Sequence, residues 1–196
     1  MKSQRKSPSS KIYQLKITLT GSNPPIWRRV VIPHDLNLGD LHHIIQICMG
    51  WCDCHLHVFK HEEKLYSDPK FELNEDPTIK YLDEKKTKLS HIFKKPKDAL
   101  AYDYDFGDGW RHLVELEKFA KATEDMPDGP SCTEGEFNCP LEDSGGIRRY
   151  QEIMKIILDP SHPEHEDLLA WVPLGFDPKY FDLWRVNYVL RLVFGW

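Results

Sequence analysis

The 196-residue chain has no apolar run of about 18 residues, so it offers no segment that could cross a membrane as a helix. Its first residues, MKSQRKSPSSK, are basic and lack the apolar stretch of a secretory signal. The five cysteines are an odd number, which argues against a disulfide scaffold and favours reduced thiols. These absences predict a soluble, cytoplasmic protein without a membrane partner.

Several motifs of large enzyme classes are also missing. The chain contains neither GxxxxGK[ST] nor GxGxxG, which cradle nucleotide phosphates. It contains neither GxSxG nor HExxH, which serve acyl hydrolases and zinc proteases. Internal repeats and low-complexity tracts are absent as well. The sequence therefore names no reaction and leaves open whether the protein is an enzyme.

The composition is that of a globular protein. Hydrophobic residues make up 40% and charged residues 29%, and six Trp, eight Tyr and nine Phe are enough to fill a core. The net charge of −5 divides unevenly, with +5 on residues 1–100 and −10 on residues 101–196. A basic half suits phosphate and an acidic half repels it, and the simplest interpretation is that the two halves attract each other within one fold.

Hydrophobic periodicity predicts strands first and helices last. The expected elements are strands at 13–19, 26–32, 55–61, 64–66, 100–106 and 110–119, and helices at 38–49, 89–93, 147–158, from 161 onward and at 179–193. The stretch 121–147 is acidic and rich in Pro and Gly, and it predicts a long irregular loop. This order predicts an α+β fold with a mixed or antiparallel sheet, β-grasp-like in its N-terminal half where it packs on a helix, and with C-terminal helices. We expect a flexible basic arm at 1–10 and a single domain at 11–196.

The stretch CDCHLH at 52–57 concentrates groups that bind zinc. Alternation along a strand places His55 and His57 on one face, so these two imidazoles converge. The spacing of Cys52 and Cys54 is poor for a structural zinc site, and for these thiols we favour a purely structural interpretation. A surface strand that carries histidines is the alternative for the imidazoles.

The stretch YDYDFGDGWRH at 102–112 predicts a β-hairpin. If the Asp-Gly pair at 108–109 forms a two-residue turn, Asp105 lies opposite His112, and the carboxylate can fix the tautomer of the imidazole. If the loop has three residues, Tyr104 faces His112 and the pair is lost. A structural alternative is that the Asp-Gly pair makes the turn while the aromatic side chains fill a core.

The stretch CPLEDSGG at 139–146 stands directly before a predicted helix. Glu142 and Asp143 are hard oxygen ligands for a cation, and the amides at the helix start can hold an anion. The alternative is an ordinary acidic loop in which Ser144 caps the helix. The sequence SHPE at 161–164 forms a capping box and is interpreted as the start of another helix.

Beyond these single stretches, the chain resembles a known family. The resemblance rests on five motifs in a fixed order: Met49-Gly50-Trp51 with His55-Leu56-His57-x-Phe59, Tyr104-Asp105-Phe106-Gly107-Asp108-x-Trp110-x-His112, Cys139-Pro140-x-Glu142-Asp143-x-Gly145-Gly146-x-x-x-Tyr150, Asp159-Pro160-x-His162-x-Glu164-His165, and Phe176-Asp177-Pro178-x-x-Phe181-Asp182. Together they resemble the plasmid pRiA4b ORF-3-like family from about Ile12 to the C-terminus. Some members carry a resolvase-like label as insertion-element passenger proteins, so the resemblance implies association with plasmids or mobile elements. It implies no demonstrated reaction.

This chain departs from the family pattern at one position. Many relatives look to have a second cysteine where this chain has Ser144. A zinc role that depends on that thiol pair therefore does not carry over. Cys52 and Cys54 lie outside the shared pattern.

Our first functional hypothesis is a binding or accessory protein. Its site would lie where the 55–59 strand, the 102–112 hairpin and the 139–146 loop meet, and Asp108 and Cys139 would belong to it. A protein partner would then need an exposed aromatic patch around Trp110.

The second hypothesis is a metal-assisted hydrolase or nuclease-like enzyme. A divalent metal would be held by His55, His57 and His112. Asp105 would orient His112, and Glu142 or Asp143 would serve as base or additional ligand.

The third hypothesis is nucleic-acid binding through the basic arm and the lysine-rich run at 85–97. That run contains no arginine, the usual reader of base edges, so a solvated surface is the favoured interpretation.

Overall fold

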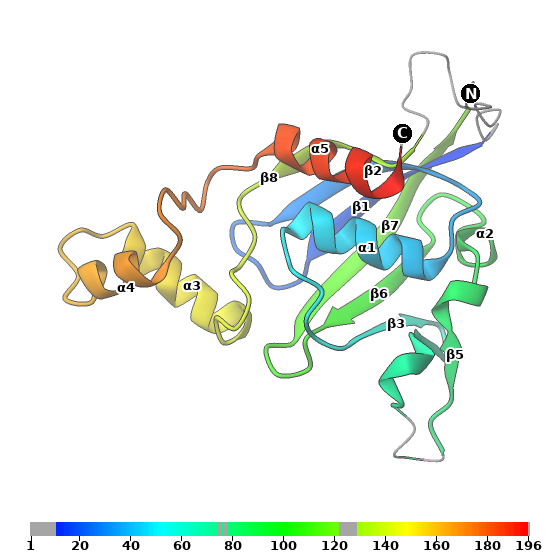
Figure 1. Ribbon diagram of the computed structural model, residues 1–196, viewed down its shortest axis with the longest axis horizontal. Helices are drawn as coiled ribbons and strands as arrows, with labels where there is room; N and C mark the ends of the chain where they lie inside the picture. The colour runs from blue at the N-terminus through cyan, green and yellow to red at the C-terminus, as the bar shows by residue number, and fades with distance from the viewer. Residues whose placement is uncertain (1–10, 74–75, 77, 122–128, 196) are drawn as a thin grey trace.

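The computed structural model describes residues 11–73, 76, 78–121 and 129–195, so the expected arm at 1–10 lies outside the described residues. It confirms the α+β fold (Figure 1). The strands are β1 (Ile12–Leu19), β2 (Trp27–Pro33), β3 (His57–His61), β4 (Lys64–Ser67), β5 (Tyr81–Asp83), β6 (Ala99–Tyr104), β7 (Trp110–Ala120) and β8 (Ser131–Glu136). The helices are α1 (Leu38–Met49), α2 (Leu89–Ile92), α3 (Gly146–Ile157), α4 (His165–Trp171) and α5 (Leu183–Phe194), with short 3-10 turns η1 (Pro69–Phe71) and η2 (Glu84–Lys86).

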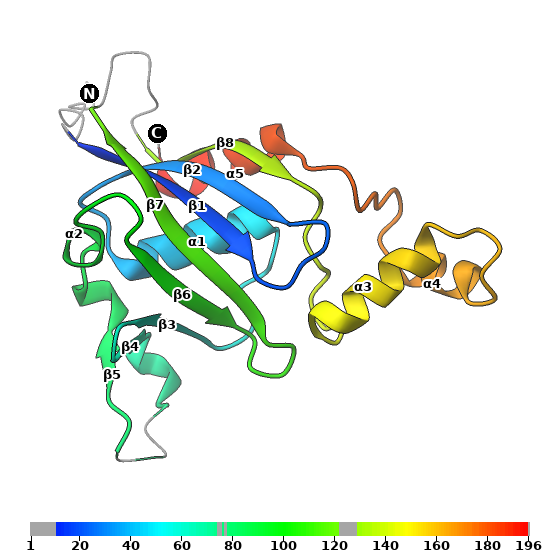
Figure 2. The same cartoon turned by 180° about the vertical axis from the view of Figure 1, so that it is seen from behind.

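The described strands form one mixed sheet in the order β5-β4-β3-β6-β7-β1-β2-β8. The β4–β5 pair is parallel and the other pairs are antiparallel. Helices α1 and α5 cover one face, and Figure 2 shows the opposite face of β1, β6 and β7 free of helices. Along β1, Leu15, Ile17 and Leu19 are fully buried while the residues between them are partly exposed. This alternation is what a sheet with one covered face requires.

Helix α1 has sequence-encoded ends. The Asn37 side chain accepts from the Asp40 amide, and Asp40 accepts in return from the Asn37 amide, so the helix begins with a capping box. Gly50 ends the helix in the left-handed conformation at φ 81°, which suits a residue without a side chain. The chain therefore turns sharply into the segment 51–56.

Arg28 fixes the end of α1 to the segment that follows β8. Its side chain is only 1% exposed, and its five N–H donors all have acceptors. The acceptors are the carbonyl oxygens of Cys48, Trp27, Glu136 and Phe137, at 2.8–2.9 Å, and the Cys139 sulfur at 3.1 Å. The Phe181 ring covers the guanidinium, with its centroid 3.8 Å from Cζ. One buried cation thus ties together the end of a helix, an edge strand and the start of a loop.

Helices α3 and α4 project beyond the end of the sheet, on the side where the β1–β2 and β6–β7 loops lie (Figures 1 and 2). They pack on each other through a small apolar cluster of Ile153, Ile157 and Val172. No helix within the described residues is long and apolar enough to cross a membrane. The assignment of 11–196 to a single domain stays a prediction.

Three local predictions were wrong. The stretch 121–147 contains strand β8, which pairs with β2 at the sheet edge, although its sequence SCTEGE lacks apolar alternation. Strand β5 was not predicted, because three residues give too short a pattern. Helix α4 begins at His165 without a side-chain cap, since the Ser161 hydroxyl donates to Asp159 instead of capping the helix.

The β6–β7 hairpin also has a different register from both predicted ones. Tyr104 pairs with Trp110 and Tyr102 pairs with His112, so the loop spans the five residues 105–109. Asp105 adopts a left-handed conformation at φ 56°, and its carbonyl accepts from the Gly109 amide. Asp105 therefore leaves the ladder and does not lie opposite His112.

Candidate functional site

Three distant segments meet at the end of the sheet nearest α3. The Trp51 indole donates to the Pro140 carbonyl over 2.9 Å, and the Cys52 amide donates to a Glu142 oxygen over 3.0 Å. The Gly145 amide donates to Asp108 Oδ2 over 3.0 Å. These bonds join the segment 51–56, the hairpin loop 105–109 and the loop 139–146, and we call their junction the three-segment site. The junction overlaps the predicted meeting of the 55–59 strand, the 102–112 hairpin and the 139–146 loop, and the role of the side chains there stays a prediction.

Gly146 makes this junction sterically possible. Its φ is +78°, and an added Cβ would come within 2.5 Å of the Asp108 carbonyl oxygen. Gly146→Ala should therefore lower the free energy of unfolding by about 2 kcal/mol or more, through backbone strain and displacement of the loop. Gly175 is a matched control, because it has φ +79° but nothing within 4 Å of its added Cβ. Urea denaturation should show a clearly smaller loss for Gly175→Ala, and equal losses would contradict a steric role for Gly146.

His55 lies at the centre of the three-segment site. Its Nε2 lies 3.3 Å from Asp143 Oδ1 and 3.8 Å from Asp105 Oδ2, yet this buried nitrogen makes no hydrogen bond. Asp105 is held in place because its Oδ1 accepts from the amides of Gly107 and Asp108. Its second oxygen is thereby aimed at the imidazole. The ligand atoms of His55, Asp105 and Asp143 all lie within 4.8 Å of one another.

A second group shares the same histidine. The ligand atoms of Cys54, His55 and Glu142 also lie within 4.8 Å of one another. Glu142 accepts from the Tyr104 hydroxyl at 2.5 Å and from the Cys54 thiol at 3.4 Å. Burial alone would raise the pKa of Glu142, but these bonds and that from Cys52 outweigh burial and lower the pKa. Burial and the Glu142 charge raise the pKa of Cys54, so its thiol is protonated near neutral pH.

The predicted trio of imidazoles does not assemble. His57 pairs with Tyr104 and His112 pairs with Tyr102, so strand β6 separates the two histidines. Among the described residues, neither belongs to a group of three close ligand atoms. The His57 Nε2 lies 2.7 Å from Glu84, and both side chains are buried. Burial lowers the pKa of His112 to about 4, so this imidazole is a neutral core residue.

Two further candidates also lie in the core. Trp110 is 1% exposed, so the aromatic patch expected around it is not at the surface. Cys139 is buried against Met49, with 2.9 Å between the sulfurs. Exposed aromatic side chains lie instead on α5, where Trp184 and Tyr188 stack with their ring centroids 5.3 Å apart.

Several buried polar side-chain atoms have no hydrogen-bond partner. In the described part of the chain, five such side-chain atoms occur, and they are His55 Nε2, His57 Nδ1, Trp110 Nε1, His112 Nε2 and Ser144 Oγ. His55 and Ser144 belong to the three-segment site, whereas the other three residues lie on strands β3 and β7. An unpaired buried donor or acceptor costs about 1–3 kcal/mol, so a bound ion or water beside His55 Nε2 would stabilise the site.

Sequence reasoning missed some of the residues that shape this site. Cys54 was given a structural role, Tyr104 was considered only as a neighbour of His112 and as part of a family motif, and Arg28 was not considered as a site residue. Nothing in the sequence places them beside the 139–146 loop. His42, His43 and Asp53 also bring ligand atoms within 4.8 Å of one another. That group is internally satisfied, since His42 Nε2 lies 2.8 Å from Asp53 and Nδ1 lies 2.8 Å from the Tyr102 hydroxyl.

The fold and the site define an α+β protein with a helix-covered mixed sheet and a His-Asp-Cys-Glu cluster where three loops meet. The chain belongs to the plasmid pRiA4b ORF-3-like protein family, whose model matches residues 11–185. It is 34% identical over 161 residues to the uncharacterized protein y4hQ of Sinorhizobium fredii (strain NBRC 101917 / NGR234), covering 82% of this chain and 80% of the relative. It also resembles the crystal structure of a protein of unknown function, MM3350 of Methanosarcina mazei Go1, with TM-score 0.78 and 36% identity over 88% of this chain and 96% of the other. Neither relative's name states an activity, and the family name alone carries the link to plasmids.

Proposed function

We propose that this protein binds a divalent metal ion, with zinc the best suited, at the three-segment site through His55, Asp105 and Asp143. The carrying observation is the buried His55 Nε2, which faces two carboxylates at 3.3 and 3.8 Å without forming a hydrogen bond. With zinc–ligand bonds of about 2.0–2.1 Å in a tetrahedron, neighbouring ligand atoms lie about 3.4 Å apart. The two distances from His55 Nε2 to the carboxylates, 3.3 and 3.8 Å, lie on either side of that value.

The donor chemistry supports zinc. One imidazole and two carboxylates suit several divalent ions, and the imidazole favours zinc over magnesium or calcium, which prefer all-oxygen ligand sets. The Asp143 side chain is 75% exposed, so the site is open to solvent on that side. An ion can enter there without unfolding the core. The predicted metal-assisted hydrolysis relied on three imidazoles that do not meet, and our proposal is therefore restricted to metal binding.

Zinc titration of the untagged, chelator-treated protein tests this proposal. We expect one zinc ion per chain by calorimetry and elemental analysis, together with a higher melting temperature. Asp105→Asn and His55→Ala should each weaken zinc binding about a hundredfold or more, because each removes a direct ligand. His43→Ala is the matched control, since His43 is a half-exposed histidine in the other candidate group.

Three results would contradict the proposal. One is the absence of stoichiometric zinc, and another is unchanged affinity in His55→Ala. Loss of binding in Cys54→Ser with none in Asp105→Asn would assign the metal to the Cys54 and Glu142 group. Cobalt substitution gives an independent answer, because a thiolate-to-cobalt charge-transfer band is expected only if Cys54 is a ligand.

The cysteines support a reducing compartment, and we propose the cytoplasm. All five are free, and two of them, Cys52 and Cys54, are exposed beside the three-segment site. Exposed thiols so close to each other persist best where disulfides are kept reduced. Nucleic-acid binding through 85–97 gains no support, since Lys85 and Lys86 are paired with Asp68 and Asp83.

A further inference from the structure

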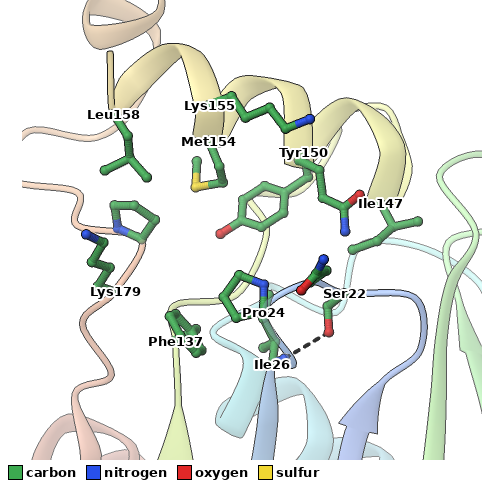
Figure 3. Close-up of a pocket in the computed structure, with 13 residues that line it drawn as sticks. Ser22, Pro24, Ile26, Phe137, Ile147, Tyr150, Met154, Lys155, Leu158 and Lys179 are labelled. Carbon is green, nitrogen blue, oxygen red and sulfur yellow. Dashed lines mark hydrogen bonds between the residues drawn. The ribbon is translucent and has the colours of Figure 1, made fainter. Parts of the chain in front are cut away.

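A separate pocket lies between the β1–β2 turn and helix α3. It has a volume of about 280 Å³ and is lined by side chains from the turn, from α3 and from the segments at 137 and 178–179 (Figure 3). The Gln151 amide donates to the Gly21 carbonyl and joins the turn to α3. Leu158, further along the pocket, is 52% exposed. The space is therefore a cleft open to solvent and not a gap within the core.

The walls of this pocket are apolar. Ile26, Phe137, Tyr150 and Met154 are among the apolar side chains that line it (Figure 3). Its neutral polar groups are mostly engaged within the protein. The Ser22 hydroxyl donates to the Leu19 carbonyl and accepts from the Ile26 amide, and the Tyr150 hydroxyl donates to the Asn138 carbonyl. A ligand would therefore be bound mainly by burial of apolar surface.

The charged side chains that line the pocket are both positive. Lys155 and Lys179 are its charged lining residues, and no carboxylate is among the residues that line it. Both lysines are exposed, and no salt bridge engages either one in the described structure. An anionic group is thus favoured at the mouth, although the C-terminal half of the chain is strongly acidic overall.

We propose that this pocket binds a small amphiphilic carboxylic acid, with its alkyl or aryl body among the apolar side chains and its carboxylate beside Lys155 or Lys179. A volume of about 280 Å³ equals roughly nine water volumes, which fits a body of about eight carbon atoms. This site is distinct from the metal site, shares no residue with it and does not depend on it.

Calorimetry and amide NMR with octanoate test the proposal. Octanol and octylammonium serve as comparison probes, because they have similar alkyl tails but a neutral and a cationic head group in place of the carboxylate. We expect octanoate to shift amide signals of the β1–β2 turn and α3, and to bind at least about tenfold more tightly than either analogue. The double variant Lys155→Gln/Lys179→Gln should weaken octanoate binding about tenfold. Lys64→Gln is the matched control, an exposed lysine on the distant strand β4.

Filling the pocket gives a second test. Met154→Trp should abolish octanoate binding because the larger side chain occupies the pocket, and its melting transition should stay cooperative. If Met154→Trp fails to fold, the lysine double variant still decides the proposal. Four results would overturn the proposal: no octanoate binding at millimolar concentration, equal binding of octanol, preferential binding of octylammonium, or unchanged binding in the lysine double variant.

Discussion

Arg28→Met is expected to lower the free energy of unfolding by about 4 kcal/mol or more. Methionine keeps much of the buried apolar stem but removes five hydrogen-bond donors. Four backbone carbonyls, one in a buried and three in part-buried hydrogen bonds, would then lose this partner, at a cost of about 1–3 kcal/mol for each group that stays unpaired. Chemical denaturation monitored by tryptophan fluorescence measures this change.

The neighbouring Arg29 provides a matched control. It lies on the same strand, but its side chain is 21% exposed and forms ion pairs with Glu117 and Glu134. Ion pairs of this kind contribute about 1 kcal/mol or less, so Arg29→Met should be much milder. Equal losses in the two variants would contradict the role assigned to Arg28. Since Arg28 also holds Phe137 and Cys139, its replacement should weaken zinc binding at the following loop.

The sheet and its helical cover could be predicted because they follow from local patterns. The alternation of Leu15, Ile17 and Leu19 marks a half-buried strand, and the spacing of apolar residues in 38–49 marks α1. Edge strands are harder to predict from sequence, because an edge strand pairs with a neighbouring strand on one side only. Fewer of its side chains then have to be apolar, and the alternation is weak. Strand β8 is such a case, and it is recognised only through its pairing with β2.

The candidate site could be predicted by segment but not by side chain. Glycines, carboxylates and histidines marked three stretches that do contact one another, since such residues occur in turns that approach one another closely. The ligand set depended on the hairpin register, however, and a five-residue loop moved Asp105 from the predicted position opposite His112 to His55. Which histidines are buried depends on contacts across the whole sheet, and no local pattern encodes that.

Those buried histidines lead to the second large effect, a loss of stability in mild acid. Burial and the nearby His57 lower the pKa of His42 to about 3, although Asp53 partly opposes the shift, and burial lowers the pKa of His112 to about 4. Between these values and the ordinary pKa of about 6.5, the unfolded chain binds protons that the folded chain does not, so stability rises with pH. Going from pH 7.5 to pH 4.5 should cost roughly 2–3 kcal/mol for each histidine.

Denaturant unfolding between pH 4.5 and 7.5 checks this expectation, because the stability that depends on the Asp68 carboxylate, whose pKa is about 2, is retained throughout that window. His112→Phe keeps an aromatic ring against Trp51 and Tyr102 and should reduce the slope of stability against pH by about one proton. His91→Gln, at an exposed histidine on α2, should leave the slope unchanged. If His112→Phe retains the full slope, His112 is not the group that charges on unfolding. His112 nevertheless takes no part in the metal site, because within the described residues it belongs to none of the groups of close ligand atoms.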